Sequence, residues 1–177
     1  MNRKQGSSGW GASGARARAP LYTPAERARR DATRWTLVQG LLAPLQFLVF
    51  AVSLVLVLRA LATGEGFALA NASVVVKTLL LYTIMVTGSI WEKVVFGKWL
   101  FAPAFFWEDV FSMLVLALHT AYIVALASGA LDARALMLLA LAAYASYVIN
   151  AAQFLLKLRA ARLDAARAPV LAGGVGA

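Results

Sequence analysis

Four long apolar runs, separated by short polar segments, dominate the pattern of hydrophobic and polar positions along the chain. A helix crosses the hydrocarbon core of a bilayer with about 20 predominantly apolar residues, and each run reaches or exceeds that length. The expected spans are about 35–58, 72–95, 108–128 and 135–156. The pattern therefore predicts an all-α integral membrane protein, a four-helix bundle.

The segments that flank the spans have a different character. Residues 1–20 are rich in Gly, Ser, Ala and Arg, and residues 161–177 in Ala, Gly and Arg, so we expect a flexible basic tail and a second flexible tail around a membrane domain of residues 21–160. Within TPAER, Thr23 as N-cap, Pro24 at the first helical position and Glu26 three residues after the cap predict a short basic helix at the membrane surface.

Polar side chains recur at helical spacing inside the spans. Gln39, Gln46 and Ser53 repeat every seven residues, which places them on one face toward the bundle interior, and helix packing is favoured over pocket lining. We expect Lys77, near one end of the second span, to extend to the interface. The fourth span carries a polar line of Ser146, Asn150, Gln153 and Lys157.

The third span carries a carboxylate and the one histidine of the chain on a single face. Glu108 and His119 are eleven residues apart, which corresponds to about 16 Å along a helix axis. A histidine inside a span can be a ligand, a proton donor or a hydrogen-bonded packing element, and the spacing leaves these alternatives open.

Composition supports the membrane class. The chain is 62% hydrophobic and only 14% charged, whereas a soluble domain usually has about 25% charged residues. It has no cysteine, which excludes disulfides, thiolate metal sites and cysteine nucleophiles.

The net charge of +9 could suggest nucleic acid, but its placement favours membrane topology. Eight of the seventeen basic residues precede Trp35 and four more lie from Lys157 onward, so they flank the spans, where they favour contact with anionic lipid. By the positive-inside rule we expect both termini and the central loop in the cytoplasm, and the loops around Gly64 and Asp132 outside.

Most of the candidate chemistry lies in residues 91–109, between the second and third spans. This stretch holds five charged residues, three tryptophans and four phenylalanines. Its carboxylates Glu92, Glu108 and Asp109 suit general acid–base work if they are removed from water. On spacing alone, ion pairs that close a cytoplasmic turn are favoured, and interfacial anchoring is favoured over ligand stacking for the tryptophans. No nucleotide loop, zinc-protease helix, nucleophile elbow or dinucleotide fingerprint is present.

Long segments of the chain match a known pattern, above all GSIWEKVVFGKWLFAPAFFWEDVFS and ALHTAY, together with YTPAERARRDATRWTLVQGLLAPLQFLVF and YVINAAQFLLKLRAARL. Over about residues 22–163 the sequence resembles the 3-vinyl bacteriochlorophyllide hydratases of purple phototrophic bacteria. The resemblance implies a hydro-lyase of bacteriochlorophyll synthesis in the cytoplasmic or intracytoplasmic photosynthetic membrane. It would add water to the ring A vinyl group of chlorophyllide a, or of a related bacteriochlorophyllide, and give a 1-hydroxyethyl group. No redox cofactor is required.

Vinyl hydration most simply starts with protonation of the terminal carbon, which leaves a cation next to the ring for water to attack. We expect Glu92 or Glu108 to give the proton, and Asp109 or the other carboxylate to orient the water. His119 would bind the magnesium of the pigment or relay a proton, with coordination preferred. The protein needs no metal of its own. The remaining substrate-binding candidates are Trp91, Phe105, Phe106 and Trp107 around the macrocycle, Lys93 or Lys98 for the propionate, and Asn150 and Gln153.

Two other classes of function compete with the hydratase. A non-catalytic pigment carrier or assembly factor would use the same aromatic slot and histidine but would not need the carboxylates. A small transporter or proton channel would need an ionisable path, for which the outer halves of the spans offer chiefly Lys77. A homodimer that holds pigment between protomers, or an assembly with other pigment-synthesis enzymes, stays open.

Overall fold

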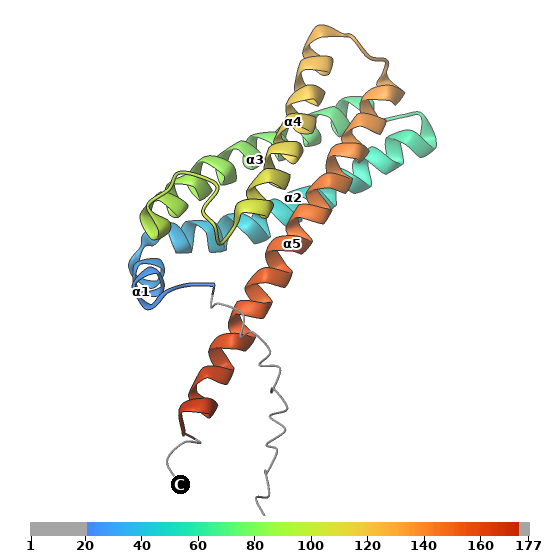
Figure 1. The fold of residues 1–177 in the computed structure, drawn as a ribbon. Coiled ribbons are helices and arrows are strands. Elements are labelled where there is room, and N and C mark those ends of the chain that lie inside the picture. The colour runs from blue at the N-terminus through green and yellow to red at the C-terminus, as the bar shows by residue number, and fades with distance from the viewer. Residues whose placement is uncertain (1–20, 174–177) are drawn as a thin grey trace, which may run out of the picture.

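Helices are the only regular secondary structure in the described part of the chain (Figure 1). The computed structural model describes the backbone of residues 21–173 and the side chains of residues 21–163. The predicted flexibility of residues 1–20 and 174–177 thus lies outside the described residues. The helices are α1 (Pro24–Ala32), α2 (Arg34–Thr63), α3 (Phe67–Phe96), α4 (Phe106–Ser128) and α5 (Ala133–Gly173).

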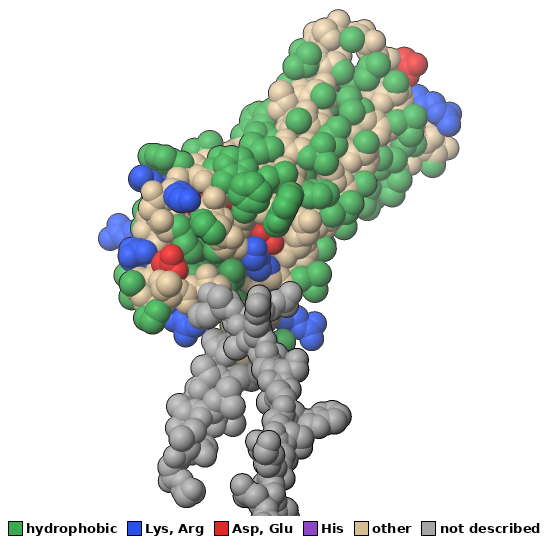
Figure 2. Space-filling view, in the orientation of Figure 1, with side chains coloured by type: hydrophobic (Ala, Val, Ile, Leu, Met, Phe, Trp, Pro, Cys, Tyr) green, Lys and Arg blue, Asp and Glu red, His purple; other side chains and the backbone are tan. Residues whose placement is uncertain are grey.

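Four helices have the length and composition of membrane spans: α2, α3, α4 and the Ala133–Leu163 part of α5. Large apolar side chains lie exposed along them, among them Leu41, Val86 and Leu114. In Figure 2 the lysine, arginine and acidic side chains gather at the two ends, and an apolar belt lies between them. Such a surface suits hydrocarbon rather than water, and the predicted all-α class with four spans is confirmed.

The spans form two antiparallel hairpins, α2–α3 and α4–α5, which pack on each other mainly through α2 and α5. Both tight turns lie at one end of the bundle (Figure 1). The other end, called the loop end below, is formed by α1 and by residues 97–105, which join α3 to α4. The polar stretch singled out in the sequence is therefore gathered at a single end of the bundle.

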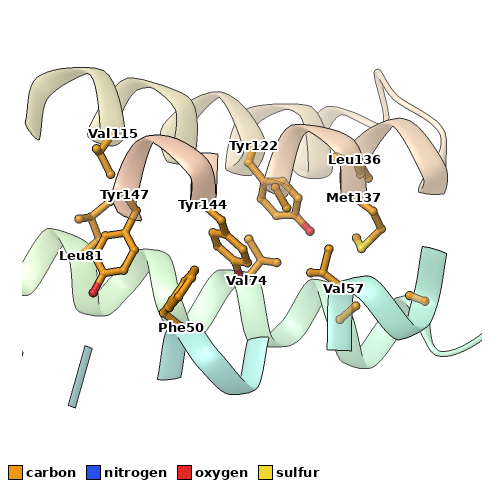
Figure 3. Packing of buried hydrophobic residues seen from close by; sticks show 13 residues of the cluster. Phe50, Val57, Val74, Leu81, Val115, Tyr122, Leu136, Met137, Tyr144 and Tyr147 are labelled. Carbon is orange, nitrogen blue, oxygen red and sulfur yellow. The ribbon is translucent and has the colours of Figure 1, made fainter. Parts of the chain in front are cut away.

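Aromatic side chains fill the space between the hairpins (Figure 3). Phe50 of α2 packs on Tyr144 and Tyr147 of α5, with ring centroids 5.3 and 5.0 Å apart. The Tyr144 hydroxyl shares a 2.6 Å hydrogen bond with Ser53, as the seven-residue repeat on α2 predicted for an inward face. In lipid, close packing and hydrogen bonds between helices replace the hydrophobic drive that holds a soluble core together.

The predicted short helix at the N-terminal side is confirmed as α1, with its capping box. Glu26 N–H donates to the Thr23 hydroxyl (3.3 Å), and Thr23 N–H donates to the Glu26 carboxylate (2.8 Å). This backbone hydrogen bond holds the pKa of Glu26 below its ordinary value. Arg29 Nε donates to the Val95 carbonyl (2.8 Å), so α1 is tied to the last turn of α3.

The helices extend beyond the spans expected from hydropathy, and one residue changes its role as a result. α3 begins at Phe67, directly after Gly66 in the left-handed region (φ 78°), so Lys77 lies about 15 Å into the helix. It shares a face with Val74, Thr78 and Leu81 and is fully buried. The expectation that Lys77 extends to the interface is therefore wrong.

At the other end of the chain, α5 continues to Gly173 and enters the segment for which a flexible tail was expected. The flexibility of that segment stays a prediction.

Candidate active site

Two carboxyl groups meet beneath the surface of the loop end. Glu92 comes from the last turn of α3 and Asp109 from the first turn of α4, and the residues are 5% and 3% exposed. The two groups lie close enough to interact with each other. Neither has an ion-pair partner among the described side chains. Two adjacent acids without a base can hold a proton between them, as paired catalytic carboxyl groups do.

The loop between α3 and α4 supplies the hydrogen-bond donors for this pair. Phe101 N–H donates to Asp109 Oδ2 (2.8 Å) and Ala102 N–H donates to Glu92 Oε2 (3.2 Å). Phe101 has φ 59° and is the only non-glycine residue with a positive φ in the described part of the chain. Such a conformation costs about 1–3 kcal/mol, and such residues cluster at functional sites. Here it accompanies two successive amides that donate to the acids.

Glu108, next to Asp109 in sequence, has a different partner. Lys157 of α5 donates to Glu108 Oε2 at 2.6 Å, and this ion pair joins α4 to α5. The Lys157 ammonium also lies 5.1 Å from the centre of the Phe105 ring. Of the three carboxylates expected to do chemistry, the structure thus brings two together and pairs the third with a lysine.

The aromatic candidates separate into an inner and an outer group. Phe105 is buried, stacks on Phe154 and meets the edge of Trp91, whose indole N–H donates to the Thr36 hydroxyl (3.0 Å). Phe106 and Trp107 contact each other on the outer surface, where Trp107 is 70% exposed. Among the aromatic candidates only Phe105 is therefore buried, with the half-buried Trp91 packed against it.

The two lysines expected at the substrate propionate are exposed. Lys93 Nζ donates to the Gly97 carbonyl (3.0 Å) and lies 5.8 Å from the centre of the Trp99 ring. An open depression of about 430 Å³ lies at the same end of the bundle. It is lined by Leu21, Glu26, Phe96, Pro103, Ala104 and Lys157.

Polar atoms continue from the carboxyl pair into the bundle. Asn150 Nδ2 donates to the Ser112 hydroxyl (2.8 Å), but Asn150 Oδ1 and Gln153 Oε1 are buried and have no partner among the described residues. Both residues lie on α5, Gln153 one turn and Asn150 two turns before Lys157, as the polar line in the sequence predicted. They leave two acceptors open below the carboxyl pair.

The chain is similar in sequence to proteins of known function. The family model described as 2-vinyl bacteriochlorophyllide hydratase (BCHF) matches residues 22–160. The chain belongs to this hydratase family. It is 73% identical over 145 residues to the 2-vinyl bacteriochlorophyllide hydratase of Cereibacter sphaeroides, covering 81% of this chain and 89% of the relative. It is 71% identical over 149 residues to the protein of that name from Rhodobacter capsulatus, covering 84% of this chain and 86% of the relative. No solved structure matches the chain.

The one histidine of the chain lies deeper in the bundle than the acids, on α4. His119 is fully buried, and its Nδ1 must be the donor in the 2.8 Å hydrogen bond to the Val115 carbonyl, because a carbonyl only accepts. In the neutral ring, Nε2 then carries the lone pair, and it has no partner among the described residues. Metal-binding histidines show this same arrangement, with the second ring nitrogen fixed by a backbone carbonyl.

The hydratase sequence also contains two interior polar residues that motif reasoning did not place in the site. Lys77 Nζ and both amide atoms of Gln46 are buried without a hydrogen-bond partner among the described residues. Gln46 was visible in the seven-residue repeat, but packing was the favoured interpretation. Lys77 could have been found from its spacing to Val74, Thr78 and Leu81, which marks the buried face of α3.

Proposed function

We propose that the protein adds water across the ring A vinyl group of chlorophyllide a, or of a related vinyl bacteriochlorophyllide, to give the 1-hydroxyethyl derivative in bacteriochlorophyll synthesis. The observation that carries this is identity of 73% and 71% to two proteins named as 2-vinyl bacteriochlorophyllide hydratases. The locants 2 and 3 denote the same ring A vinyl group in the older and the current numbering of the macrocycle.

In the proposed mechanism, Glu92 and Asp109 act as a pair. The protonated member gives its proton to the terminal vinyl carbon, and the vinyl π electrons form the new C–H bond. The cation that remains on the carbon next to the ring is delocalised by the macrocycle and stabilised by the nearby carboxylate. Water forms the C–O bond there and loses a proton to the ionised member, so the pair again holds one proton.

We assign Glu108 to positioning rather than to proton transfer. Its carboxylate already has a partner, the Lys157 ammonium at 2.6 Å. The pair fixes the first turn of α4 against α5 and thereby places Asp109, the next residue.

The macrocycle would lie against Trp91 and Phe105 and extend from the carboxyl pair into the bundle. His119 follows Asp109 by ten residues on α4, about 15 Å along the axis, and its free Nε2 suits an axial bond to the magnesium of the substrate.

The loop end would face the cytoplasm of a phototrophic bacterium. Basic residues are more frequent there, on α1 and around Lys93, Lys98 and Lys157, than at the turns near Arg59 and Arg134. Four spans then place both termini on the cytoplasmic side of the cytoplasmic or intracytoplasmic membrane.

The direct test is to incubate membranes that contain the protein with chlorophyllide a and to follow absorbance and product mass. Gain of one water, with the red band moving to shorter wavelength as the vinyl group leaves conjugation, is the expected result. Pigment binding without a change of mass would instead support a pigment carrier. Absence of both binding and hydration would leave the proposed function without support.

A further inference from the structure

A buried lysine without an ion-pair partner among the described residues lies in the interior of the bundle. Lys77 is fully buried about a third of the way along α3, and its Nζ has no hydrogen-bond or ion-pair partner among the described residues. Its closest aromatic contact is the face of Tyr147, 3.8 Å from the ring centre. A charged side chain at membrane depth is costly unless it is paired, and in membrane proteins such residues usually belong to a binding site or an ion path.

Two further side chains with buried atoms that lack a partner among the described residues, Gln46 and His119, lie near the aromatic residues around Tyr147. Gln46 lies one turn before Phe50, which packs on Tyr147, and its amide nitrogen and oxygen are both unpaired among the described residues. The His119 ring, whose Nε2 has no partner among the described residues, lies beside Tyr144, one turn from Tyr147 on α5, with ring centroids 5.9 Å apart. Figure 3 shows Phe50, Tyr144 and Tyr147 side by side between the helices. α2, α3 and α4 thus each contribute an unpaired polar group to one region of the bundle interior.

The chemistry of these groups defines what they would bind. An ammonium and an amide N–H₂ are donors that together match a carboxylate, and a free imidazole nitrogen matches a metal ion. A single ligand that carries both a carboxylate and a metal at fixed separation would satisfy all of them. The substrate of the proposed function is such a molecule, because a chlorophyllide has a free propionate on ring D and magnesium at its centre.

We propose that Lys77, assisted by the Gln46 amide, binds the propionate carboxylate of the pigment inside the membrane, so that Lys77 makes the enzyme selective for the free acid over its ester. This inference rests on the proposed function. It gives the propionate to a buried lysine rather than to Lys93 or Lys98, the exposed lysines expected from the sequence.

The spacing along α3 is compatible with this assignment. Lys77 and Glu92 are fifteen residues apart, about 22 Å along the axis. Part of this interval is taken up by the flexible lysine stem, the glutamate side chain and the contacts at both ends. The pigment would span what remains, with its ring A vinyl group toward Glu92 and its ring D propionate toward Lys77. His119 lies between these two points, where the centre of the macrocycle would be.

The packing indicates where the macrocycle would enter. The hairpins pack more closely through α2 and α5 than through α3 and α4. At the lipid-facing side of α3 and α4, Tyr82 and Thr120 share an exposed 2.8 Å hydrogen bond. Separation of these two helices would open the interior that contains Lys77 and His119 to a pigment dissolved in the bilayer.

The test compares chlorophyllide a with its propionate methyl ester, measuring binding to the purified full-length protein and hydration in membranes. For the wild type we expect a preference for the acid of about tenfold or more, the effect of removing one member of a buried charge pair. Lys77→Met should bind and hydrate the ester like the wild type and lose the preference. Lys93→Met and Lys98→Met should keep it.

Ester hydration by Lys77→Met is the folding control, and Lys77→Gln is a second variant if methionine prevents folding. Equal treatment of acid and ester by the wild type would overturn the inference, whatever the variants do. The inference would also be overturned if Lys93→Met or Lys98→Met lost the preference for the acid while Lys77→Met kept that preference. If the wild type hydrates neither pigment, the proposed function fails, while a Lys77-dependent preference in binding still decides this inference.

Discussion

Three carboxyl groups lie within two helix turns of the loop end, and their different partners give them different properties. Glu108 has an ammonium at 2.6 Å, whereas Glu92 and Asp109 have backbone amides and each other. A matched ion pair keeps a carboxylate ionised, while adjacent acids without a base favour a shared proton. The same chemical group can therefore be a structural anchor or a proton donor, depending on what faces it.

Glu92→Gln and Asp109→Asn should each lower the rate of chlorophyllide hydration by about 10²–10⁴-fold, the usual contribution of general acid–base catalysis. Both amides are close in size to the acids, so pigment binding should persist. Glu65→Gln, an exposed acid at the opposite end, is the matched control and should be unaffected. Full turnover by both variants would show that the pair does not carry the chemistry.

Glu108→Gln should instead lower stability, because it leaves the Lys157 ammonium without its carboxylate. We expect a loss of about 1–3 kcal/mol, seen as a lower Tm of the detergent-solubilised protein. The double variant Glu108→Gln/Lys157→Met removes the unpaired charge and should recover part of that loss. If the stability losses of Glu108→Gln and Lys157→Met simply add up in the double variant, the ion pair does not contribute to stability.

For individual residues, the sequence identified the candidate site residues but not the groups that they contact. Glu92, Asp109 and His119 were found from residue type and helical spacing. The pairing of Glu92 with Asp109 depends on how α3 and α4 approach each other and on a positive φ at Phe101, which no sequence pattern near it indicates. Lys77 was misplaced because the start of its helix was set five residues late.

Among the elements, the segment 97–105 matters most, since its backbone amides hold both acids. It leaves α3 through Gly97, which caps the helix with φ 78°. A side chain at this position meets no other atom but must adopt a left-handed conformation that only glycine adopts easily. Changes at Gly97 should therefore act through the backbone of this segment.

Gly97→Ala should cost about 1 kcal/mol of stability and should lower the hydration rate, because the amides of Phe101 and Ala102 shift relative to the acids. Gly40→Ala is the matched control: it also meets no neighbouring atom, but it lies inside α2 with ordinary helical geometry. Thermal unfolding and hydration assays on both variants decide the point. If the two variants unfold at the same temperature and hydrate at the same rate, the left-handed cap at Gly97 is not needed for stability or activity.

The elements themselves were largely predictable. The capping box at Thr23 predicted α1, and hydropathy predicted four spans, because both signals are local. The ends of the spans were less accurate, since hydropathy marks where apolar residues stop and not where the backbone leaves the helix. The Gly64–Gly66 turn, with both glycines at positive φ, sets the true end of α2 and start of α3.

For the molecule as a whole, the absence of cysteine allows membrane orientation to be measured with single introduced cysteines. Glu65→Cys and Lys98→Cys replace exposed residues at opposite ends of the bundle. In intact cells a membrane-impermeant maleimide should label Glu65→Cys, while Lys98→Cys should react only after lysis. The reverse pattern would place the loop end outside and contradict the proposed topology.

The central claim, that this bundle protonates and hydrates a vinyl pigment, is tested most directly by isotope incorporation. Chlorophyllide a is incubated with membranes containing the protein in D₂O enriched in heavy oxygen, and the product is returned to ordinary water before mass analysis. We expect one deuterium in the new methyl group, from protonation of the terminal carbon, and one heavy oxygen in the hydroxyl group. A product without solvent oxygen, or with no deuterium on the terminal carbon, would contradict the mechanism.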